Sequence, residues 1–384
     1  MSKLILVKDF LGKVFTDMSQ NIKSSDKYKY VGLENFFEQR FLIQHNKVQM
    51  IIDHSLTGLR VVVNGNEIQI SPELYHHPFV RVSNSIEQDT QSNSRKLFSS
   101  NTFSTMSYLV CQNHSMFQIS ENLMAPIYIT FKTDYESFYN SVLLFIIDSS
   151  IDLEIVEEIE SHCALNNVSN YIVNKNAKLN LSTFYQNQLS AESFSFRNII
   201  AMEESQFTHN LAGKSSAKIL DEIKVTYHKN SKISLNGMIY GKGGAFHSVI
   251  NTVTSEPNND VNINYKTILE NKAKITLKSN VEIKNASTAN VKIQNLILND
   301  NCFIMAKPVL DIKSDEAICF HGVTNSTINE DELVYLMSRN ISKEDAFVML
   351  KKSFFEEIID KVDIKSKYGT GEFYDYKERF ILSI

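Results

Sequence analysis

The sequence has few cysteines, no excess of basic residues and no long apolar run. Its 384 residues carry a formal net charge of −5, which argues against broad nucleic-acid binding because that usually requires a basic surface. No stretch approaches the 18 apolar residues that indicate a transmembrane helix. Charges also interrupt the N-terminal segment, which has no continuous apolar core of the secretory type. We therefore expect a cytoplasmic protein without a membrane or nucleic-acid partner.

The four cysteines are far apart and form no CxxC pair; they are Cys111, Cys163, Cys302 and Cys319. A disulfide framework and a structural zinc site made from local pairs are both unexpected in such a chain. Reduced thiols are the default, and three of the four are expected to be small buried hydrophobic residues.

A loose repeat runs through residues 116–328, where short alternating runs are separated by Asn, Lys, Ser and Gly. A small residue marks each repeat at positions 150, 177, 205, 231, 273 and 302, with spacings of 27, 28, 26, 42 and 29 residues. Recurrence near 27 with β character predicts a parallel solenoid of two or three strands per coil. We interpret the long interval as a polar insert around 241–259. A β-sandwich is the alternative, because its strands also alternate.

The regions on either side of this repeat differ from it. Residues 1–115 are expected to be mixed and largely helical, because apolar residues recur at helical spacing over Lys3–Met18 and Gly32–Leu42. Within them, the β-type run Val48–Ile70 is expected to form a hairpin that turns at Asn64-Gly65. Residues 329–384 are expected to form two helices and a tail. Asn329 and Ser342 supply the helix caps.

Several motifs associated with catalysis are incomplete or missing. The GKSS segment at 213–216 has Thr208 where a phosphate-binding loop requires glycine, so we expect no nucleotide bound by this chain. No nucleophile-elbow sequence is present. Carboxylates do not recur in register along the repeat, as they would in a β-helix enzyme that cleaves polysaccharide.

Cys319 and His321 are the most informative candidates for chemistry. They lie two residues apart, so on an extended backbone their side chains share one face, while Ile318 and Phe320 share the other. A soft thiol beside an imidazole can hold a transition metal. Two ligands do not complete a site, so any remaining ligands must come from elsewhere. We expect the pair to point outward, where a neighbouring protein could supply them. By pattern alone, such a pair is more often structural than metal-binding.

The surrounding sequence resembles the SufB/SufD family of iron–sulfur cluster assembly proteins. The resemblance lies in four ordered segments: Pro308-x-Leu310-x-Ile312, Cys319-Phe-His321-Gly322-Val-Thr324, Leu333-Val-Tyr335-Leu-x-Ser338-Arg339 and Ala346-x-x-x-Leu350-x-x-x-Phe354. Weaker similarity extends to the APIYI run, the IVEEIE run and KYKYVGL near the N-terminus. The sequence departs from the family pattern at Asp311, Val323, Asn340 and Tyr28, which stand for Glu, Ala, Gly and Trp.

Two positions make the chain similar to the SufD branch. His321 is followed by Gly322, whereas the SufB pattern has His-Glu there, and Ile293 stands where SufB has its scaffold cysteine. The resemblance implies a right-handed parallel β-helix between helical ends. It also implies a complex with a SufB-like scaffold protein and a SufC-like ABC ATPase, and a homodimer is an option for the isolated chain.

The resemblance further implies where these partners bind. His321, Cys319 and Pro308 would lie at a cluster-assembly interface, with a transient iron–sulfur cluster held partly by His321 and Cys319. The ATPase would dock on the C-terminal helices, and the matching positions are Tyr335, Arg339, Ala346, Leu350 and Phe354.

Three hypotheses for the function follow. The leading one is a non-catalytic assembly subunit that completes a site shared with another protein. The first alternative is a β-helix enzyme that cleaves polysaccharide, with Cys319 and His321 merely buried. The second alternative is an iron-storing or iron-delivering protein, which two local ligands support weakly.

Overall fold

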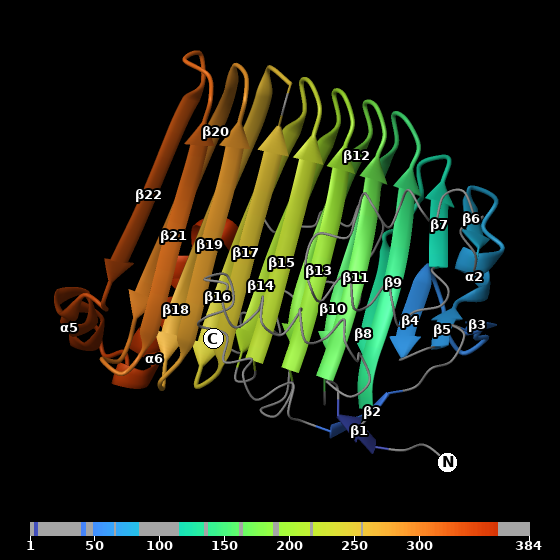
Figure 1. Ribbon diagram of the computed structural model, residues 1–384. Helices are drawn as coiled ribbons and strands as arrows, with labels where there is room; N and C mark the ends of the chain where they lie inside the picture. Colours follow the sequence, from blue (N-terminus) through green and yellow to red (C-terminus); the bar gives the residue numbers. More distant parts are fainter. Residues whose placement is uncertain are drawn as a thin grey trace.

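A computed structural model gives the architecture of the chain (Figure 1). It describes residues 4–6, 40–43, 49–64, 67–83, 115–133, 137–160, 164–186, 192–215, 218–254 and 256–359. These residues form a parallel β-solenoid of two long sheets, followed by two helices. No helix in these ranges is both long and apolar enough to cross a lipid bilayer.

Each coil contributes one strand to each sheet. Sheet A contains β1 (Leu4–Leu6), β2 (Arg40–Ile43), β6 (Val80–Ser83), β7 (Ser115–Ile119), β9 (Ser137–Ile147), β11 (Ala164–Val173), β13 (Glu192–Ala201), β15 (Lys218–Tyr227), β17 (Ala245–Thr254), β19 (Lys274–Ile283) and β21 (Phe303–Ile312). Sheet B contains β3 (Gln49–Ile52), β4 (Arg60–Asn64), β5 (Glu67–Ile70), β8 (Ile127–Lys132), β10 (Asp152–Glu160), β12 (Lys178–Gln186), β14 (Gln206–Ser215), β16 (Lys232–Lys242), β18 (Asn259–Glu270), β20 (Ser287–Ile297) and β22 (Ile318–Ser326).

Parallel pairing between coils distinguishes the solenoid from the sandwich alternative. Lys178 pairs with Gln206, which pairs with Lys232, so neighbouring strands of sheet B lie 28 and 26 residues apart in sequence. A sandwich joins neighbouring strands mainly by antiparallel hairpins and Greek keys. The predicted parallel β-solenoid is therefore confirmed, with two strands in each coil.

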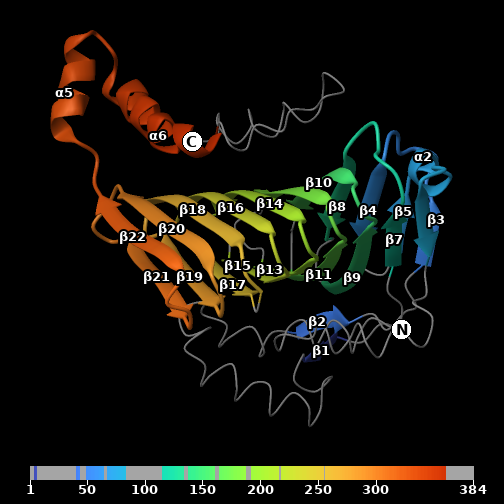
Figure 2. The same cartoon turned by 90° about the horizontal axis from the view of Figure 1, so that it is seen from above.

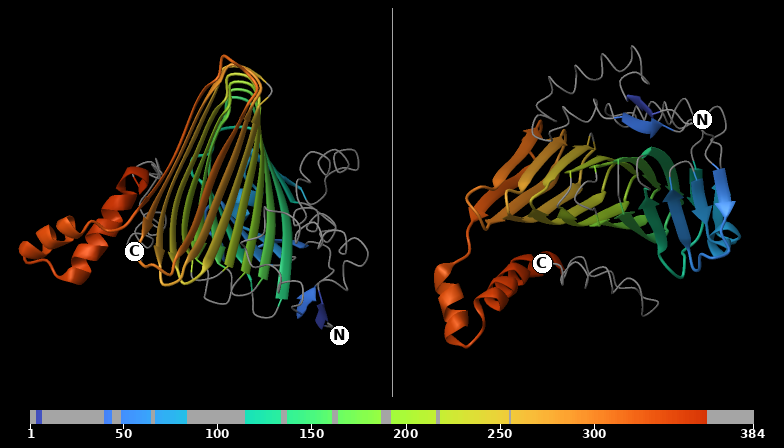
Figure 3. Two further views of the ribbon diagram at one scale, coloured as in Figure 1. Left: turned by 60° about the vertical axis from the view of Figure 1, so that its left-hand side comes forward. Right: turned by 90° about the horizontal axis from the view of Figure 1, so that it is seen from below.

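A corner that recurs before several sheet B strands explains the repeat in the sequence. Asn176 and Asn230 adopt positive φ angles of 58°, a conformation that asparagine tolerates better than most residues. The small residues that follow them, Ala177 and Ser231, are completely buried. A left-handed residue followed by a small buried one thus turns the chain into the next strand. The two sheets meet along this ridge of corners (Figure 3).

The polar insert predicted at 241–259 is not found, because strand β17 occupies residues 245–254. Ser231 is followed in its row by Asn259, whose side chain accepts a hydrogen bond from the Ser231 backbone at 2.8 Å. Ala273 instead precedes β19 on the opposite sheet. The interval of 42 residues therefore spans one and a half coils, and the marker residues change from one sheet to the other.

The interior is mainly apolar, but its centre holds an ion-pair network. The Arg197 guanidinium bonds the Glu157 carboxylate at 2.7 Å and the Asp221 carboxylate at 2.5 Å, and all three side chains are completely buried. Tyr171 donates to Glu157 at 2.5 Å and Tyr185 donates to Asp221 at 2.6 Å. The network crosses between the sheets and fixes the position of several coils relative to one another.

Most of the two N-terminal helical stripes falls outside the described residues. The described parts, Leu4–Leu6 and Arg40–Ile43, are strands. The predicted hairpin is found, because β4 pairs antiparallel with β5. Helix α2 (Pro72–Tyr75) then follows, capped by the Ser71 side chain.

The two C-terminal helices form a hairpin. Helix α5 (Glu330–Ser338) stands away from the sheets, while α6 (Lys343–Ile359) runs along the outer face of sheet B (Figure 2). Phe355 and Ile358 of α6 are completely buried against apolar side chains of sheet B. Lys266 of β18 also donates to the Phe354 carbonyl at 2.9 Å. Helix α6 thus anchors the hairpin to the solenoid.

Candidate functional site at the end of the solenoid

Strands β21 and β22 form the last coil of the stack (Figure 1). Strand β21 pairs with β19 and β22 pairs with β20, and no other described strand pairs with either. Apolar side chains in register with buried residues of the preceding coil are exposed here. Ile312 is 44% exposed although it is in register with the buried Ile283, and Val323 is 38% exposed although it is in register with the buried Ile293. The described part of the chain thus leaves both the edges and the apolar groups of this coil accessible.

Cys319 and His321 do share one face of β22, but that face is directed towards the interior row. Cys319 is in register with Ala289 and His321 with Val291, and both of these partners are buried in the core. In parallel sheets, residues in register point to the same side. The expectation that the pair lies on the outer face therefore differs from the structure, since Ile318 and Phe320 occupy that face.

The pair is nevertheless not enclosed. Cys319 is partly buried and contacts the edge of the core, whereas His321 is exposed. Both follow from their position, because no further coil lies over the inner row in the described residues. The thiol and the imidazole are thus accessible from the end of the stack rather than from its side.

Burial raises the pKa of the Cys319 thiol above its ordinary value, and a hydrogen bond to the Ala289 backbone opposes this shift. The neutral thiol therefore predominates near pH 7. Because metals bind the thiolate, Cys319 must lose a proton before it can serve as a ligand. A positive charge or a metal brought close to it would favour that loss.

Pro308 lies on the corresponding inner row of β21. It is in register with Ser279, which is buried in the preceding coil. Proline has no backbone N–H and is suited to the edge of a sheet. Pro308 thus belongs to the same end face as Cys319 and His321, on the opposite sheet.

The described residues contain no group of three or more metal-binding side chains. Cys319 and His321 could supply two ligands, a soft one and a borderline one. An iron–sulfur cluster is usually held by four protein ligands. These two side chains alone do not complete such a shell.

The predicted ATPase-docking residues divide into two groups. Tyr335 is 58% exposed on α5, and the Arg339 guanidinium stacks on its ring at 5.3 Å. Ala346 is completely buried, and Leu350 and Phe354 are partly buried. Leu350 and Phe354 line a cavity of about 290 Å³ between α6, α5 and the end of β20. Only the first group is presented outward.

Sequence reasoning did not single out as docking candidates three exposed apolar residues of the helical hairpin, namely Val334, Met337 and Met349. Their signal was that the two helices hold more apolar residues than one buried face requires. Asn340, which stands where the family pattern has glycine, adopts a φ of 65° just after α5. Asparagine tolerates this left-handed conformation, so the departure keeps the turn.

Comparison with known proteins gives a consistent result. Residues 130–354 match the model of the SufBD core domain of the SUF system for FeS cluster assembly. The chain is 34% identical over 96 residues to a SufBD family protein of Synechocystis and 28% identical over 161 residues to one of Pyrococcus horikoshii. It is 26% identical over 99 residues to the iron-sulfur cluster assembly protein SufD of Escherichia coli.

These alignments are partial. They cover 25%, 40% and 25% of this chain and 20%, 34% and 23% of the three relatives, respectively. The chain thus spans about a third or less of the length of these relatives.

Proposed function

Because the chain belongs to the SufBD family of iron–sulfur cluster assembly proteins, we propose that it acts as a SufD-like subunit of a Suf scaffold complex. In this proposal it forms a composite cluster-assembly interface with a SufB-like protein and docks a SufC-like ATPase. The observation that carries the proposal is the accessible last coil, on which Cys319, His321 and Pro308 share the inner rows.

The geometry of the last coil supports a shared site. The edges of β21 and β22 offer backbone groups to an incoming strand, and the exposed Ile318 and Phe320 offer apolar area. A partner that covers this end would exclude water from Cys319 and His321. It would also supply the ligands that these two residues lack, so that a transient cluster, the cargo of the complex, is held across the interface.

Two positions favour the SufD role over the SufB role. Gly322 follows His321, where the SufB pattern has Glu. A Cβ added at this glycine would meet no atom within 4 Å, so packing does not force a glycine here and the departure from the SufB pattern is not a steric necessity. Ile293 takes the place of the SufB cysteine and lies buried on an inner row, in register with Val323. The chain thus offers no thiol at that position.

The helical hairpin is the proposed docking site for the ATPase. Helix α5 has no buried residue and contacts mainly α6, while Val334, Tyr335 and Met337 expose apolar surface. In this proposal α6 transmits a movement of the docked ATPase to sheet B, because Phe355 and Ile358 attach it there. Ala346, Leu350 and Phe354 then hold the hairpin together and do not contact the partner.

The proposed subunit is non-catalytic and cytoplasmic, binds neither membrane nor nucleic acid, and forms a homodimer through the same end when isolated. The polysaccharide-cleaving alternative requires two carboxylates that a sugar can reach. The close carboxylates of the solenoid interior, Glu157 and Asp221, are completely buried and paired with Arg197. That geometry gives the alternative no support.

The test is reconstitution with SufB-like and SufC-like partners, followed by iron and sulfide analysis of the purified complex. His321→Ala should leave the circular dichroism spectrum and complex formation intact but abolish cluster assembly. His54→Ala is the matched control, because this exposed histidine lies at the opposite end of the solenoid. Undiminished assembly by His321→Ala would remove this residue from the mechanism, and failure to co-purify with either partner would contradict the complex.

A further inference from the structure

Three lysines from three different elements converge where α6 crosses sheet B. Lys214 of β14 is in register with Tyr240 of β16. Lys242 follows Tyr240 by two residues on β16 and therefore shares its outward face. Lys351 reaches the same place from α6. The ammonium groups of Lys214 and Lys351 lie 5.9 and 5.2 Å from the centre of the Tyr240 ring.

One carboxylate stands among these ammonium groups. Glu270 of β18 is in register with Lys242 and accepts a hydrogen bond from the Tyr240 hydroxyl. Burial lowers the pKa of Lys214 and of Lys351, and the neighbouring lysines add to this effect while Glu270 opposes it. The three lysines are therefore close enough to repel one another, and positive charge accumulates at this point of the surface.

We propose that Lys214, Lys242 and Lys351 form a binding site for a phosphate-type oxyanion. Lys351 as a residue is only 9% exposed, and its ammonium group is held over the Tyr240 ring, so it loses little freedom on binding. Ala212, Met238 and Ile268 form an apolar floor beside the cluster. Charges in such surroundings interact more strongly than they do in open water.

Lys242 begins the Gly-rich turn 242–244, where Gly243 has a φ of 80°. A Cβ added at Gly243 would lie 3.3 Å from the Asn271 carbonyl oxygen, so glycine keeps this turn close to its neighbour. This site differs from a nucleotide-binding loop, because its charges project from strands and from the middle of a helix rather than from a loop that opens a helix. It recognises the oxyanion through ammonium groups and is independent of the proposed cluster interface.

The test is a calorimetric titration of the full chain with inorganic phosphate at constant ionic strength. Saturable binding is expected, and the double substitution Lys214→Ala with Lys242→Ala should weaken it by at least about tenfold, because each lost charge contact removes a charge-assisted interaction. Lys232→Ala is the matched control. It lies on the same strand as Lys242, at the other end, and is likewise exposed.

Each outcome of this titration decides the proposal. No saturable heat with phosphate, or equal loss of affinity in Lys232→Ala and in the double variant, would overturn it. Lys351→Met provides a second variant: if its circular dichroism spectrum shows an intact fold, its affinity for phosphate should also fall, and unchanged affinity would overturn the three-lysine site. A parallel titration with ADP identifies the source of the oxyanion. If ADP binds more tightly than phosphate and the double variant loses this affinity, the site takes a nucleotide. If ADP binds equally or more weakly, the site takes the free anion.

Discussion

Replacing Arg197 by methionine tests the buried network at the centre of the solenoid. The substitution removes a guanidinium that bonds Glu157 at 2.7 Å and Asp221 at 2.5 Å, all of them inaccessible to solvent. Each lost hydrogen bond to a charged group costs roughly 1.5–3 kcal/mol. Breaking a buried pair by removing one partner costs about 3–5 kcal/mol, since a charge remains buried without compensation. We therefore expect a loss of about 3–5 kcal/mol from a total stability of roughly 5–15 kcal/mol.

The assay is equilibrium unfolding in urea, followed by circular dichroism because the chain contains no tryptophan. Arg339→Met is the control. This arginine stacks on an exposed tyrosine, so its loss should cost at most about 1 kcal/mol. A triple variant in which Arg197, Glu157 and Asp221 are all replaced by apolar residues should recover most of the stability. A loss below about 1 kcal/mol for Arg197→Met would refute the reasoning, because the guanidinium would then not be compensating the two carboxylates.

Three further predictions concern single side chains. Burial, together with the positive charge of the nearby Arg197, holds the pKa of His209 well below its ordinary value. The unfolded state therefore binds more protons below pH about 6.5, and stability should fall by up to about 1.4 kcal/mol for each pH unit by which the pH is lowered there. His209→Leu should lose this dependence when urea unfolding is compared at pH 7.5 and 5.5. Gly237→Ala should lower the melting temperature, because its Cβ would lie 2.2 Å from the Tyr265 ring, whereas Gly322→Ala, with no atom within 4 Å, should not. Cys319 should react with iodoacetamide with a half-maximal pH above that of a free thiol, because burial raises its pKa; a half-maximal pH at or below the free value would contradict this.

The coil repeat was predictable because its signal is local. A left-handed residue followed by a small buried one appears in the sequence as Asn176-Ala177 and Asn230-Ser231, and it needs no knowledge of distant contacts. The allocation of repeats to sheets was not predictable from this signal. Lys272-Ala273 also combines a positive φ with a buried small residue, but it precedes a strand of sheet A. Both corners meet the same steric requirement, so the signal does not tell them apart.

The orientation of the candidate site was harder to predict for a different reason. Alternation showed that Cys319 and His321 share one face and that Ile318 and Phe320 share the other, but it does not say which of the two faces is directed inward. Register decides this, since Cys319 continues the buried row that contains Ala289. The ion-pair network was equally hidden, because Arg197 lies 40 residues from Glu157 and 24 from Asp221. Neither relation has a local signature.

The two ends of the stack explain why the site lies where it does. Near the first coils, helix α2 buries Leu74 completely and an antiparallel hairpin joins the sheet, so this end has its own cover. A solenoid usually needs a cap at each end because its terminal coils would otherwise expose the core.

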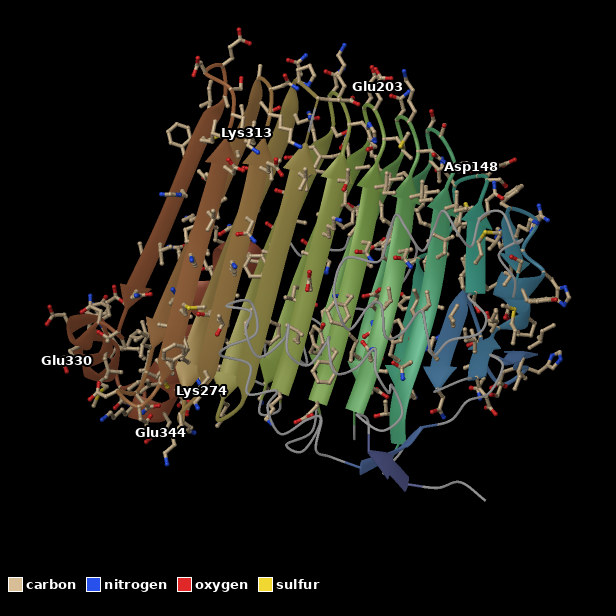
Figure 4. The ribbon with its side chains drawn as sticks, viewed as in Figure 1. Asp148, Glu203, Lys274, Lys313, Glu330 and Glu344 are labelled. Atoms are coloured by element: carbon tan, nitrogen blue, oxygen red, sulfur yellow. The ribbon has the colours of Figure 1, made fainter. Side chains whose placement is uncertain are left out.

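At the last coil the chain leads instead into α5, which projects away, and into α6, which lies on the outer face of sheet B (Figure 2). The side chains of this coil therefore reach the end of the molecule uncovered in the described residues, in contrast to the inner coils (Figure 4). An apolar end with exposed strand edges associates readily, and the thiol and imidazole beside it take part in whatever surface closes it. The same geometric fact thus accounts for the accessibility of Cys319 and His321 and for the need for a partner.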